Sequence, residues 1–575
     1  MAILGVHNAH DAGAGLVSYG SVASAVNEER FTKRKNDVGF PEHSIKYLME
    51  SGEEISGVAI PWIGGSVIFT RIFPKIEEER LRLWRKEGKK PTRFRMHITN
   101  ALFKTIQDQR PRAVWKAAGI AVGNATIGAR LRRMGIKQKP VFVEHHLAHA
   151  SSAYYASGFK EALVITLDGG GDGVSGSISI GDNGELNRIN EFRASCSIGA
   201  LFGAATLACD MRYSEDEGKL MSLAAYSYPS EIKELGRFSR YDEKKRQLVS
   251  DSGIKYEFLL AEHLRDKILW RYNREAFAYA VQRHLEEQVL KIVKQYIKET
   301  GIRRIAVAGG VFSNIIVNML INELHEVKDF FVAPQMGDGG LALGAAYYAD
   351  YVQNGKFNAR QVEGIYYGPE YSSSEIENAL QRHKKEGAIV YQEEKDISGR
   401  CAEMLAEENK IVLWFQGRME LGPRALGNRS VLAMPNNQKN RDEINIIIKK
   451  RPYYQPFAST ILEEDADKLL DPYPRKSRFM TIGYRVRPER FGEISAASHI
   501  DMTTRPQILG NENQLYRRLL ERIRKKTGIG ALLNTSFNKH GFPIVRTPED
   551  AIWTLMNTGA RYLAIGNFLV EKRKR

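Results

Sequence analysis

The sequence has few cysteines and no long hydrophobic run. Its 575 residues include only three cysteines, Cys196, Cys209 and Cys401, which suit neither a disulfide framework nor a CxxC metal site. No apolar stretch approaches the roughly 20 residues that a membrane-spanning helix needs. The first residues, MAILGVHNAHDAG, lack the basic start and the small-residue cleavage site of a signal peptide. We therefore expect a cytoplasmic protein with no membrane partner.

Positive charge is in excess and is unevenly placed. The net charge is +16, and residues 71–140 contain 19 lysines and arginines against 5 acidic residues. Such a surface could attract nucleic acid or a phosphorylated ligand. The simpler interpretation is a solvated, basic helical insertion, because no RNA- or DNA-binding motif accompanies the charge. Nucleic acid stays among the candidate partners.

Two glycine-rich segments repeat one plan. Residues 3–20 and residues 162–184 each contain an apolar strand, a turn rich in small residues, a second strand and a glycine turn. A further strand-like run follows each of them. This repeat predicts a duplicated α/β unit with a ligand between its halves. Glycines in such turns let backbone N–H groups approach an anion closely.

The remaining pattern divides the chain into two domains. Helical spacing over 274–301 ends at a glycine, and two strand–turn–helix segments follow it. We expect a first domain over 1–360, a polar, irregular linker over 361–395 and a second α/β domain over 396–575. In the second domain Thr547 and Pro548 have the residue types that begin a helix.

The segment HLAHASSAYYAS is rich in alanine and predicts a helix. His145 and His149 are four residues apart, so a helix would place them on one face, about a turn apart, with His146 pointing elsewhere. Two imidazoles can share a divalent metal with the carboxylates of Asp168 and Asp338, which follow other strands. From the residues alone, the histidines could equally be structural, and the two aspartates could merely shape their glycine turns.

His10 lies in the first small-residue turn, beside Asp11. A histidine placed there could act as a general base near neutral pH. An ordinary histidine in a surface turn is the alternative.

The second domain contains a basic loop, GRMELGPRALGNRS. Its guanidinium groups, those of Arg418, Arg424 and Arg429, suit phosphate binding, and the flanking segments look buried. Lys449 and Arg451 add charge further along the chain. Ser536 and Asn538, at the end of a strand-like run, could complete a polyphosphate site. The sequence therefore favours an anion site in this domain.

The chain resembles the NodU/CmcH family of O-carbamoyltransferases over nearly its whole length. The motifs that carry the resemblance are HDAG, NEERFTKRKND, EHHLAHASSAYYASGF, LDGGGDG, EGKLMSLAAY, MGDGG, RMELGPRALGNRS and NTSFN, in this order. The resemblance implies a duplicated ASKHA (actin/Hsp70-like) domain followed by a YrdC-like α/β domain.

The family's chemistry gives each domain an expected role. The second domain would form carbamoyl-adenylate from carbamoyl phosphate and ATP, with Mg2+ as counter-ion. The first would pass the carbamoyl group to a hydroxyl of a small acceptor, such as a sugar, an antibiotic or another metabolite. That transfer would occur at a metal site, commonly Fe2+, with Mn2+ or Zn2+ as alternatives. A homodimer is also implied.

The same resemblance assigns residues by position. His145, His149, Asp168 and Asp338 match the metal ligands, and His10 matches the active-site histidine. Segments that match adenylate-binding positions contain Gly170, Gly171, Lys219, Gly309, Gly310 and Asn314. Lys449 with Arg451, and Ser536 with Asn538, match the KxR and SxN pairs of YrdC-like domains.

Some positions depart from the family pattern. Gly13 replaces a serine, so a hydroxyl near the phosphate is missing. Gln455 and Ser459 stand where arginine and proline are usual, which removes one anion-binding charge, and Phe542 stands where glutamate is common. GGVFSN also replaces the more typical GGVALN.

Two other functions fit parts of the sequence. A tRNA-modifying enzyme or RNA-binding protein of related fold would use the basic 71–140 region, and its RNA binding would weaken sharply with salt. A nucleotide binder that has lost its chemistry would release no pyrophosphate from ATP and carbamoyl phosphate.

Overall fold

The computed structural model of the chain describes residues 1–63, 68, 71–87, 92–98, 113–358, 360–385, 387–473 and 475–573. It divides into two compact units, both α/β as expected. The first contains Met1–Glu28 and Asn36–Val362, and the second contains Glu29–Lys35 and Glu363–Arg575. No helix within the described ranges is both long enough and apolar enough to cross a membrane.

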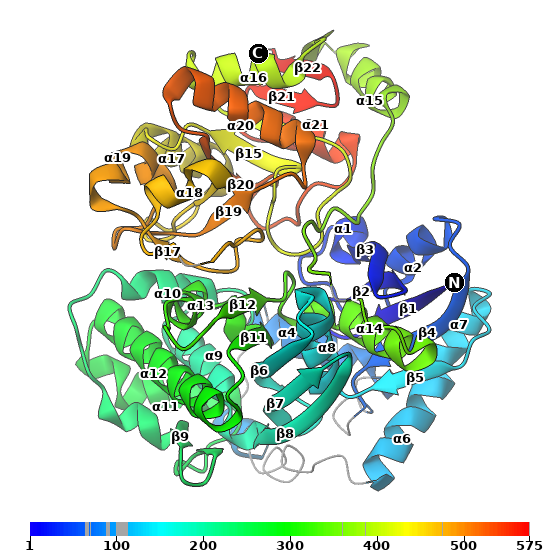
Figure 1. Cartoon of the computed structure of the whole chain (residues 1–575), viewed down its shortest axis with the longest axis vertical. Helices are drawn as coiled ribbons and strands as arrows, with labels where there is room; N and C mark the ends of the chain where they lie inside the picture. The colour runs from blue at the N-terminus through cyan, green and yellow to red at the C-terminus, as the bar shows by residue number, and fades with distance from the viewer. Residues whose placement is uncertain are drawn as a thin grey trace. The chain divides into compact units, whose positions relative to one another are not determined.

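The first unit contains two five-stranded sheets that share one plan (Figure 1). The strand order is β3-β2-β1-β4-β5 in one sheet and β8-β7-β6-β11-β12 in the other. In each, three strands form an antiparallel meander, and two more run parallel to the first of the three. The strands are β1 Ala2–His7, β2 Gly13–Ser18, β3 Ser21–Asn27, β4 Ile55–Pro61, β5 Pro140–Val143, β6 Glu161–Gly171, β7 Val174–Asp182, β8 Glu185–Arg193, β11 Arg304–Ala308 and β12 Asp329–Val332. The predicted duplication is confirmed.

A helix follows the last strand of each sheet and packs on the opposite sheet. Helix α8 (His145–Ser157) follows β5 and contacts β6, β7 and β11, whereas α14 (Leu341–Asn354) contacts β1, β2 and β4. The two helices also contact each other between the sheets (Figure 1). Their approach depends on small residues: a Cβ on Gly344 of α14 would lie 1.9 Å from the carbonyl oxygen of Ala148 in α8.

Other helices surround this core. They are α2 Glu42–Met49, α9 Ile198–Ala208, α10 Glu217–Ala224, α11 Glu257–Lys267, α12 Arg274–Thr300 and α13 Ile315–Asn322. A small ribbon pairs β9 Arg240–Asp242 with β10 Gln247–Val249. Helix α12 ends at Gly301, whose φ of 71° is the left-handed conformation that glycine adopts readily, so the predicted glycine stop is confirmed.

The segment between β4 and β5 is mostly helical where the structure describes it. It contains α4 Pro74–Trp84 and α6 Ala113–Gly123, and a wider turn connects α6 to α7 Ala129–Arg133. This agrees with a helical insertion. Residues 88–91 and 99–112 of the basic region lie outside the described residues.

The second unit is built on one mixed sheet of eight strands, in the order β13-β22-β21-β14-β15-β20-β16-β19. The strands are β13 Ile389–Glu393, β14 Val412–Phe415, β15 Arg429–Ala433, β16 Ala458–Leu462, β19 Pro506–Leu509, β20 Ala531–Ser536, β21 Tyr562–Ile565 and β22 Phe568–Lys572. A short ribbon pairs β17 Tyr484–Arg485 with β18 Thr503–Thr504. The helices are α1 Glu29–Thr32, α15 Ser373–Lys385, α16 Ile397–Ala406, α17 Gln438–Ile444, α18 Glu463–Leu469, α19 Phe491–Ile494, α20 Gln514–Thr527 and α21 Pro548–Met556.

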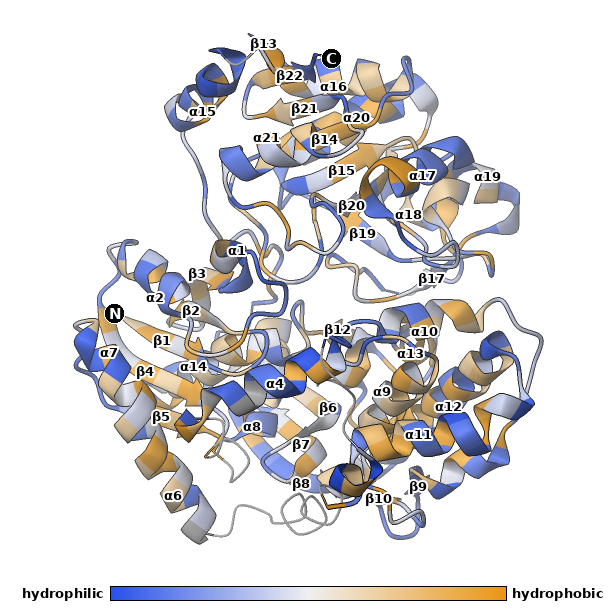
Figure 2. Ribbon diagram, turned by 180° about the vertical axis from the view of Figure 1, so that it is seen from behind, coloured by the Kyte–Doolittle hydropathy of each residue, from blue (hydrophilic) through white to orange (hydrophobic). Residues whose placement is uncertain are grey.

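Helices cover both faces of this sheet. Because strand side chains alternate, Val412 and Trp414 pack with α16 and α20, whereas Leu413 and Phe415 pack with α15 and α21. Figure 2 shows the hydrophobic character of the central strands β15 and β20. Helix α21 begins as predicted: the Thr547 hydroxyl accepts a hydrogen bond from the Asp550 backbone N–H, and the Asp550 carboxylate accepts one from the Thr547 backbone N–H. The helix ends at Met556.

The irregular linker expected over 361–395 is wrong for most of its length. Helix α15 and strand β13 occupy it, and β13 pairs antiparallel with β22 at the edge of the second sheet. Buried Ile376, Ala379 and Leu380 recur at helical spacing, while the polar residues that suggested a linker form the exposed side of α15.

Replacing Gly344 by alanine should destabilise the first unit, because the added methyl group would overlap the Ala148 carbonyl. Overpacking a fitted contact costs about 1–3 kcal/mol, so thermal unfolding should shift down by several degrees. Gly218→Ala in α10 is the matched control, since no atom lies within 4 Å of its Cβ position. Equal unfolding midpoints for the two variants would contradict this prediction, because α8 and α14 would then accommodate the methyl group with no loss of stability.

Candidate functional site

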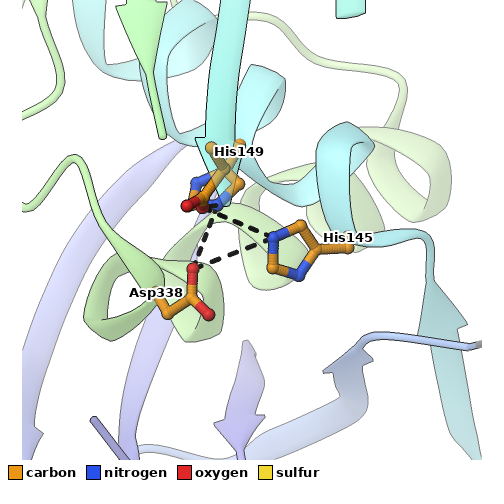
Figure 3. Close-up of side chains that lie close together, drawn as sticks. His145, His149 and Asp338 are labelled. Carbon is orange, nitrogen blue, oxygen red and sulfur yellow. Dashed lines mark hydrogen bonds and ion pairs between the residues drawn. The ribbon is translucent and has the colours of Figure 1, made fainter. Parts of the chain in front are cut away.

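Four side chains expected to bind metal converge in the first unit. Ligand atoms of His145, His149, Asp168 and Asp338 all lie within 4.8 Å of one another. His149 Nε2 is 3.0 Å from Asp168 Oδ2 and 3.3 Å from Asp338 Oδ1. His145 Nε2 is 3.6 Å and 3.8 Å from the same two oxygens. Figure 3 shows His145, His149 and Asp338 pointing at a common centre.

Three elements position this cluster. His145 and His149 are one turn apart on α8, whose first turn is held by Glu144, the acceptor for the Leu147 N–H. The carboxylate of Asp172 accepts the His145 backbone N–H at 2.9 Å. Asp168 lies near the end of β6, and Asp338 lies in the turn before α14. The helical spacing and the strand-end aspartates in the sequence therefore meet in space.

Burial and charge hold the cluster ionised. Burial disfavours the protonated form of His149, but the two aspartates outweigh it and raise its pKa to about 9. Burial also favours the neutral carboxyl groups, yet the histidines lower the pKa of both Asp168 and Asp338 below the usual range. A buried carboxylate and a partly buried one, those of Asp338 and Asp168, thus share one small region and require a positive partner.

The donor set fits a divalent cation. Both ring nitrogens of His145 and the Nδ1 of His149 are buried, and within the described part of the chain they have no hydrogen-bond partner. Leaving such groups unsatisfied costs about 1–3 kcal/mol each. Two imidazoles with two carboxylates suit Fe2+, Mn2+ or Zn2+. These residues could hold such an ion.

Glycines leave space for the ligands. A Cβ on Gly171 would lie 2.2 Å from Cγ of His145, and one on Gly310 would lie 3.0 Å from Asp168 Oδ1. Gly309 has a φ of 104°, and a Cβ there would lie 2.2 Å from the Leu167 carbonyl oxygen. Gly171, Gly309 and Gly310, which the resemblance assigns to adenylate binding, thus also shape the metal-ligand cluster.

His10 lies against this cluster. Its Nε2 is 3.1 Å from Asp338 Oδ2, and its Nδ1 is 3.3 Å from Asp11 Oδ2. Burial opposes protonation, but the two carboxylates prevail and raise the pKa of His10 well above its usual value. A ring placed between two carboxylates can pass a proton between them.

Residues that the sequence analysis did not single out complete the surroundings. His7 is buried, and its Nε2 is 2.9 Å from the His10 carbonyl oxygen. The Trp62 ring lies 4.8 Å from the His145 ring, edge to face, and the Trp84 ring lies 6.1 Å from the His10 ring. His7 ends a strand three residues before His10, and this position could have identified it from the sequence as a neighbour of the site. Nothing in the sequence marks the tryptophans.

His146 supports the helix from behind. Its Nδ1 is 2.8 Å from Thr166 Oγ1, and its Nε2 is 3.0 Å from the Val174 carbonyl oxygen. Burial lowers its pKa to about 3, so the ring is neutral. As the helical spacing predicts, its ring points away from the other two histidines' shared centre.

Two residues expected to bind adenylate have other partners. The Asn314 side chain accepts hydrogen bonds from the first turn of α13 and exchanges two more with Gln282. Asn314 therefore acts as a helix cap, which its position before an apolar helix favours. Lys219 forms an ion pair with Asp216 at 2.8 Å. Gly170, with a φ of 145°, lies in β6 two residues after Asp168, where the pairing with β7 is irregular.

In the second unit the predicted KxR and SxN pairs meet. Lys449 is 2% exposed. Its Nζ donates to the Ser536 carbonyl, to Ser536 Oγ at 3.1 Å and to Asn538 Oδ1 at 2.9 Å. The hydroxyl of Ser536 in turn donates to Asn538 Oδ1 at 2.6 Å. Arg451 lies beside them and contacts Thr535 Oγ1 at 3.4 Å.

Several cations gather here. Burial lowers the pKa of Arg424 to about 10, and burial together with the charge of Arg424 lowers that of Arg451 to about 10. Arg505, which the sequence analysis missed, has its pKa lowered by burial and by both of these arginines. Burial, Arg451 and Lys35 lower the pKa of Lys449. No hydrogen bond or ion pair to a described residue occupies Arg424, so the cluster is ready to receive an anion.

Two arginines of the basic loop have carbonyl partners within the protein. The guanidinium of Arg429 is fully buried and donates to the carbonyls of Gln416, Gly417, Asn428 and Pro369. Arg418 donates to the carbonyls of Tyr367 and Gly368. Arg429 thus braces the loop, Arg418 is partly occupied, and Arg424 is the loop arginine with no described partner, so phosphate binding by the loop stays a prediction that Arg424 suits best. An arginine-rich motif does not indicate which guanidinium turns inward.

Some cations of the basic region 71–140 pair with acidic side chains where the structure describes them. Arg82 pairs with Glu78, Arg85 with Glu215, and Lys86 with Asp210. Arg93 lies close to both Glu262 and Asp266. Cations paired in this way leave less charge for phosphate groups, and this geometry favours the helical insertion over a nucleic-acid surface.

Replacing His149 by alanine should remove the bound metal. We expect purified wild-type protein to contain about one divalent transition-metal ion per chain, because four ligand atoms converge. Gly171→Ala should lower the metal content without removing a ligand, since its methyl group would displace the His145 ring. His325→Ala, at an exposed surface position, is the control. Elemental analysis checks this, and equal metal content in all four proteins would contradict it.

Comparison with known proteins gives the family. Residues 2–347 match the family model described as carbamoyltransferase N-terminus, and residues 402–572 match that described as carbamoyltransferase C-terminus. The chain is 32% identical to nodulation protein NolNO of Sinorhizobium fredii, with 98% of this chain and 79% of that protein aligned. It is 30% identical to the 3'-hydroxymethylcephem-O-carbamoyltransferase of Amycolatopsis lactamdurans, with 61% of this chain and 64% of that protein aligned.

Among solved structures, that of HypF from T. kodakarensis aligns with 62% of this chain and 48% of that chain, at a TM-score of 0.35 and 12% identity. The family assignment rests on the sequence matches, which cover most of the chain. The protein is therefore an enzyme that belongs to the carbamoyltransferase family.

Proposed function

We propose that this enzyme is an ATP-dependent O-carbamoyltransferase with its two half-reactions in different parts of the chain. The second domain consumes carbamoyl phosphate, ATP and one water, releases phosphate and pyrophosphate, and yields carbamoyl-adenylate. The first domain transfers the carbamoyl group from this adenylate to an acceptor hydroxyl, and AMP leaves. One observation carries this division: the first unit gathers two histidines and two carboxylates that suit a cation, and the second gathers lysine and arginine side chains that suit an anion.

The second centre suits phosphoryl chemistry. Such reactions depend on positioning and on neutralising phosphate charge, and they need little covalent help from the protein. Arg424, Arg451 and Arg505 supply guanidinium groups for phosphate oxygens. Lys449, fixed by Ser536 and Asn538, supplies a point charge, with Mg2+ arriving as the counter-ion of ATP.

The first centre suits acyl transfer. His145, His149, Asp168 and Asp338 would hold the divalent cation, with Fe2+ the first expectation. A bound ion would supply a Lewis acid for the carbamoyl carbonyl and would neutralise the charge of the two carboxylates. His10 then takes the proton of the acceptor hydroxyl, and Asp11 stabilises the resulting imidazolium.

The acceptor is proposed to be a small hydroxylated molecule. The cephem relative is named for an O-carbamoylation of that kind. Trp62 and Trp84 place apolar rings near His145 and His10, which suits exclusion of water from an activated carbamoyl group. The paired cations of the 71–140 region give no support to a nucleic-acid acceptor.

Variants at the two centres should separate the half-reactions. Lys449→Ala should abolish pyrophosphate release that depends on both ATP and carbamoyl phosphate, because a buried cation of the anion site is lost, and the metal content should stay unchanged. His149→Ala should keep that release but lose metal and transfer. Pyrophosphate detection and elemental analysis on the same preparations check both. Loss of both activities in each folded variant would show one shared centre.

Incubation with carbamoyl phosphate, ATP, Mg2+ and a panel of hydroxylated acceptors should add about 43 daltons to one of them, the difference between a carbamoyl group and hydrogen. Mass spectrometry detects this gain. His10→Asn should lower its rate by about 100-fold, the usual contribution of a general base. If RNA gains the carbamoyl group and no small molecule does, the proposal of a small acceptor is wrong.

A further inference from the structure

The motif NEERFTKRK has no part in the chemistry described above, yet its place in the fold is unusual. Residues Glu29–Lys35 belong to the second unit, although the residues before and after them belong to the first. This docked segment, 29–35, includes the short helix α1. A seven-residue piece from the start of the chain is therefore part of the unit that contains the anion site.

Polar contacts fix the docked segment. The Arg546 guanidinium lies 4.5 Å from the centre of the Phe31 ring, and its Nε donates to the Arg30 carbonyl at 3.3 Å. Lys33 forms an ion pair with Asp550 in the first turn of α21. These contacts hold the backbone around Arg30 in one place.

Arg30 reaches from this segment to the basic loop. Its side chain is buried, and its Nη2 donates to the Gly422 carbonyl at 2.8 Å, while Nη1 pairs with Glu29 at 2.9 Å. Gly422 has a φ of 98°, a backbone conformation that favours glycine. Arg424, the loop arginine left for the anion, lies two residues further along.

The rest of the loop is braced elsewhere. The carboxylate of Glu420 accepts the backbone N–H groups of Leu426 and Arg429, and Leu421 N–H donates to the Ile365 carbonyl. Close to Arg424, the described hydrogen bonds hold two backbone carbonyls, those of Gly422 before it and Ala425 after it. Arg30 holds Gly422, and Asn534 Nδ2 donates to the Ala425 carbonyl at 3.3 Å.

We propose that Arg30 is a positioning residue: from the docked segment it fixes the Gly422 carbonyl and thereby aims Arg424 at the anion. This role rests on the proposed function, in which the second unit binds phosphate groups. It makes the phosphate site of the second unit depend on a residue from the first 30 positions of the chain. A buried guanidinium suits the task because its planar donors are already oriented.

A double-mutant cycle in the full-length protein tests the proposal. The measurement is the Kd for pyrophosphate, by calorimetry, of wild type, Arg30→Met, Arg424→Gln and the double variant. Methionine keeps most of the buried volume and removes the donors. We expect Arg424→Gln to weaken binding about tenfold or more, the loss of one charge-assisted contact, and Arg30→Met to weaken it about three- to tenfold.

If Arg30 acts through Arg424, adding Arg30→Met to Arg424→Gln should change the Kd by less than about twofold. Arg30→Lys, which keeps a donor, should restore part of the affinity, and it replaces the methionine variant if that one does not fold. Arg34→Gln removes an exposed charge from the same segment and should bind pyrophosphate as wild type does.

If the Kd increase of the double variant equals the product of the two single increases, the two residues act independently. That result would overturn the role of Arg30 and leave the proposed function intact. An equal loss of affinity in Arg34→Gln would also overturn it, because charge alone would then explain the effect. A wild-type protein that does not bind pyrophosphate would overturn the anion site itself. Unchanged metal content in every variant confirms that the first unit remains folded.

Discussion

Two carboxylates that lie side by side in a largely buried region set the main constraint on this enzyme. Asp168 and Asp338 come from different elements, and each would be unstable as an anion in an apolar interior without a positive partner. His149 and His10 supply that partner here, which is why the pKa of both imidazoles is raised. The crossing of α8 and α14 between the two sheets brings these groups together, and the close contact at Gly344 permits the crossing.

The second unit has the opposite requirement. Lys449, Arg451 and Arg505 are cations in a desolvated setting, and the charges that shift their pKa values are also positive. Burial of like charges is costly unless a ligand compensates them. The two units therefore have complementary needs, a cation in one and an anion in the other. A carbamoyltransferase that first activates its donor with a nucleotide requires both.

Much of this was predictable from the sequence because the signals were local. Strand-like apolar runs separated by glycine turns predict hairpins, so residues 3–20 and 162–184 predicted the duplicated sheets. The spacing of His145 and His149 gave one face of a helix. Partner choice for a single side chain is not local, however. Arg429 and Arg424 have the same chemistry in one loop, and only the fold turns the first to four carbonyls and leaves the second without a partner among the described residues. The Asn314 side chain, which the resemblance assigns to adenylate binding, caps α13 in the fold.

The division into domains shows the same limit. A contiguous second domain was expected after a linker, but the exposed, polar side of α15 imitates a linker in the sequence. The docked segment 29–35 is harder still to predict, because its contacts with Gly422, Arg546 and Asp550 span most of the chain. A buried arginine just after a strand gives no local sign of its partner. Its acceptor is a backbone carbonyl, which every residue has, so no residue type in the sequence marks the partner. Motifs without assigned chemistry, such as NEERFTKRK, are therefore best interpreted through what they hold in place.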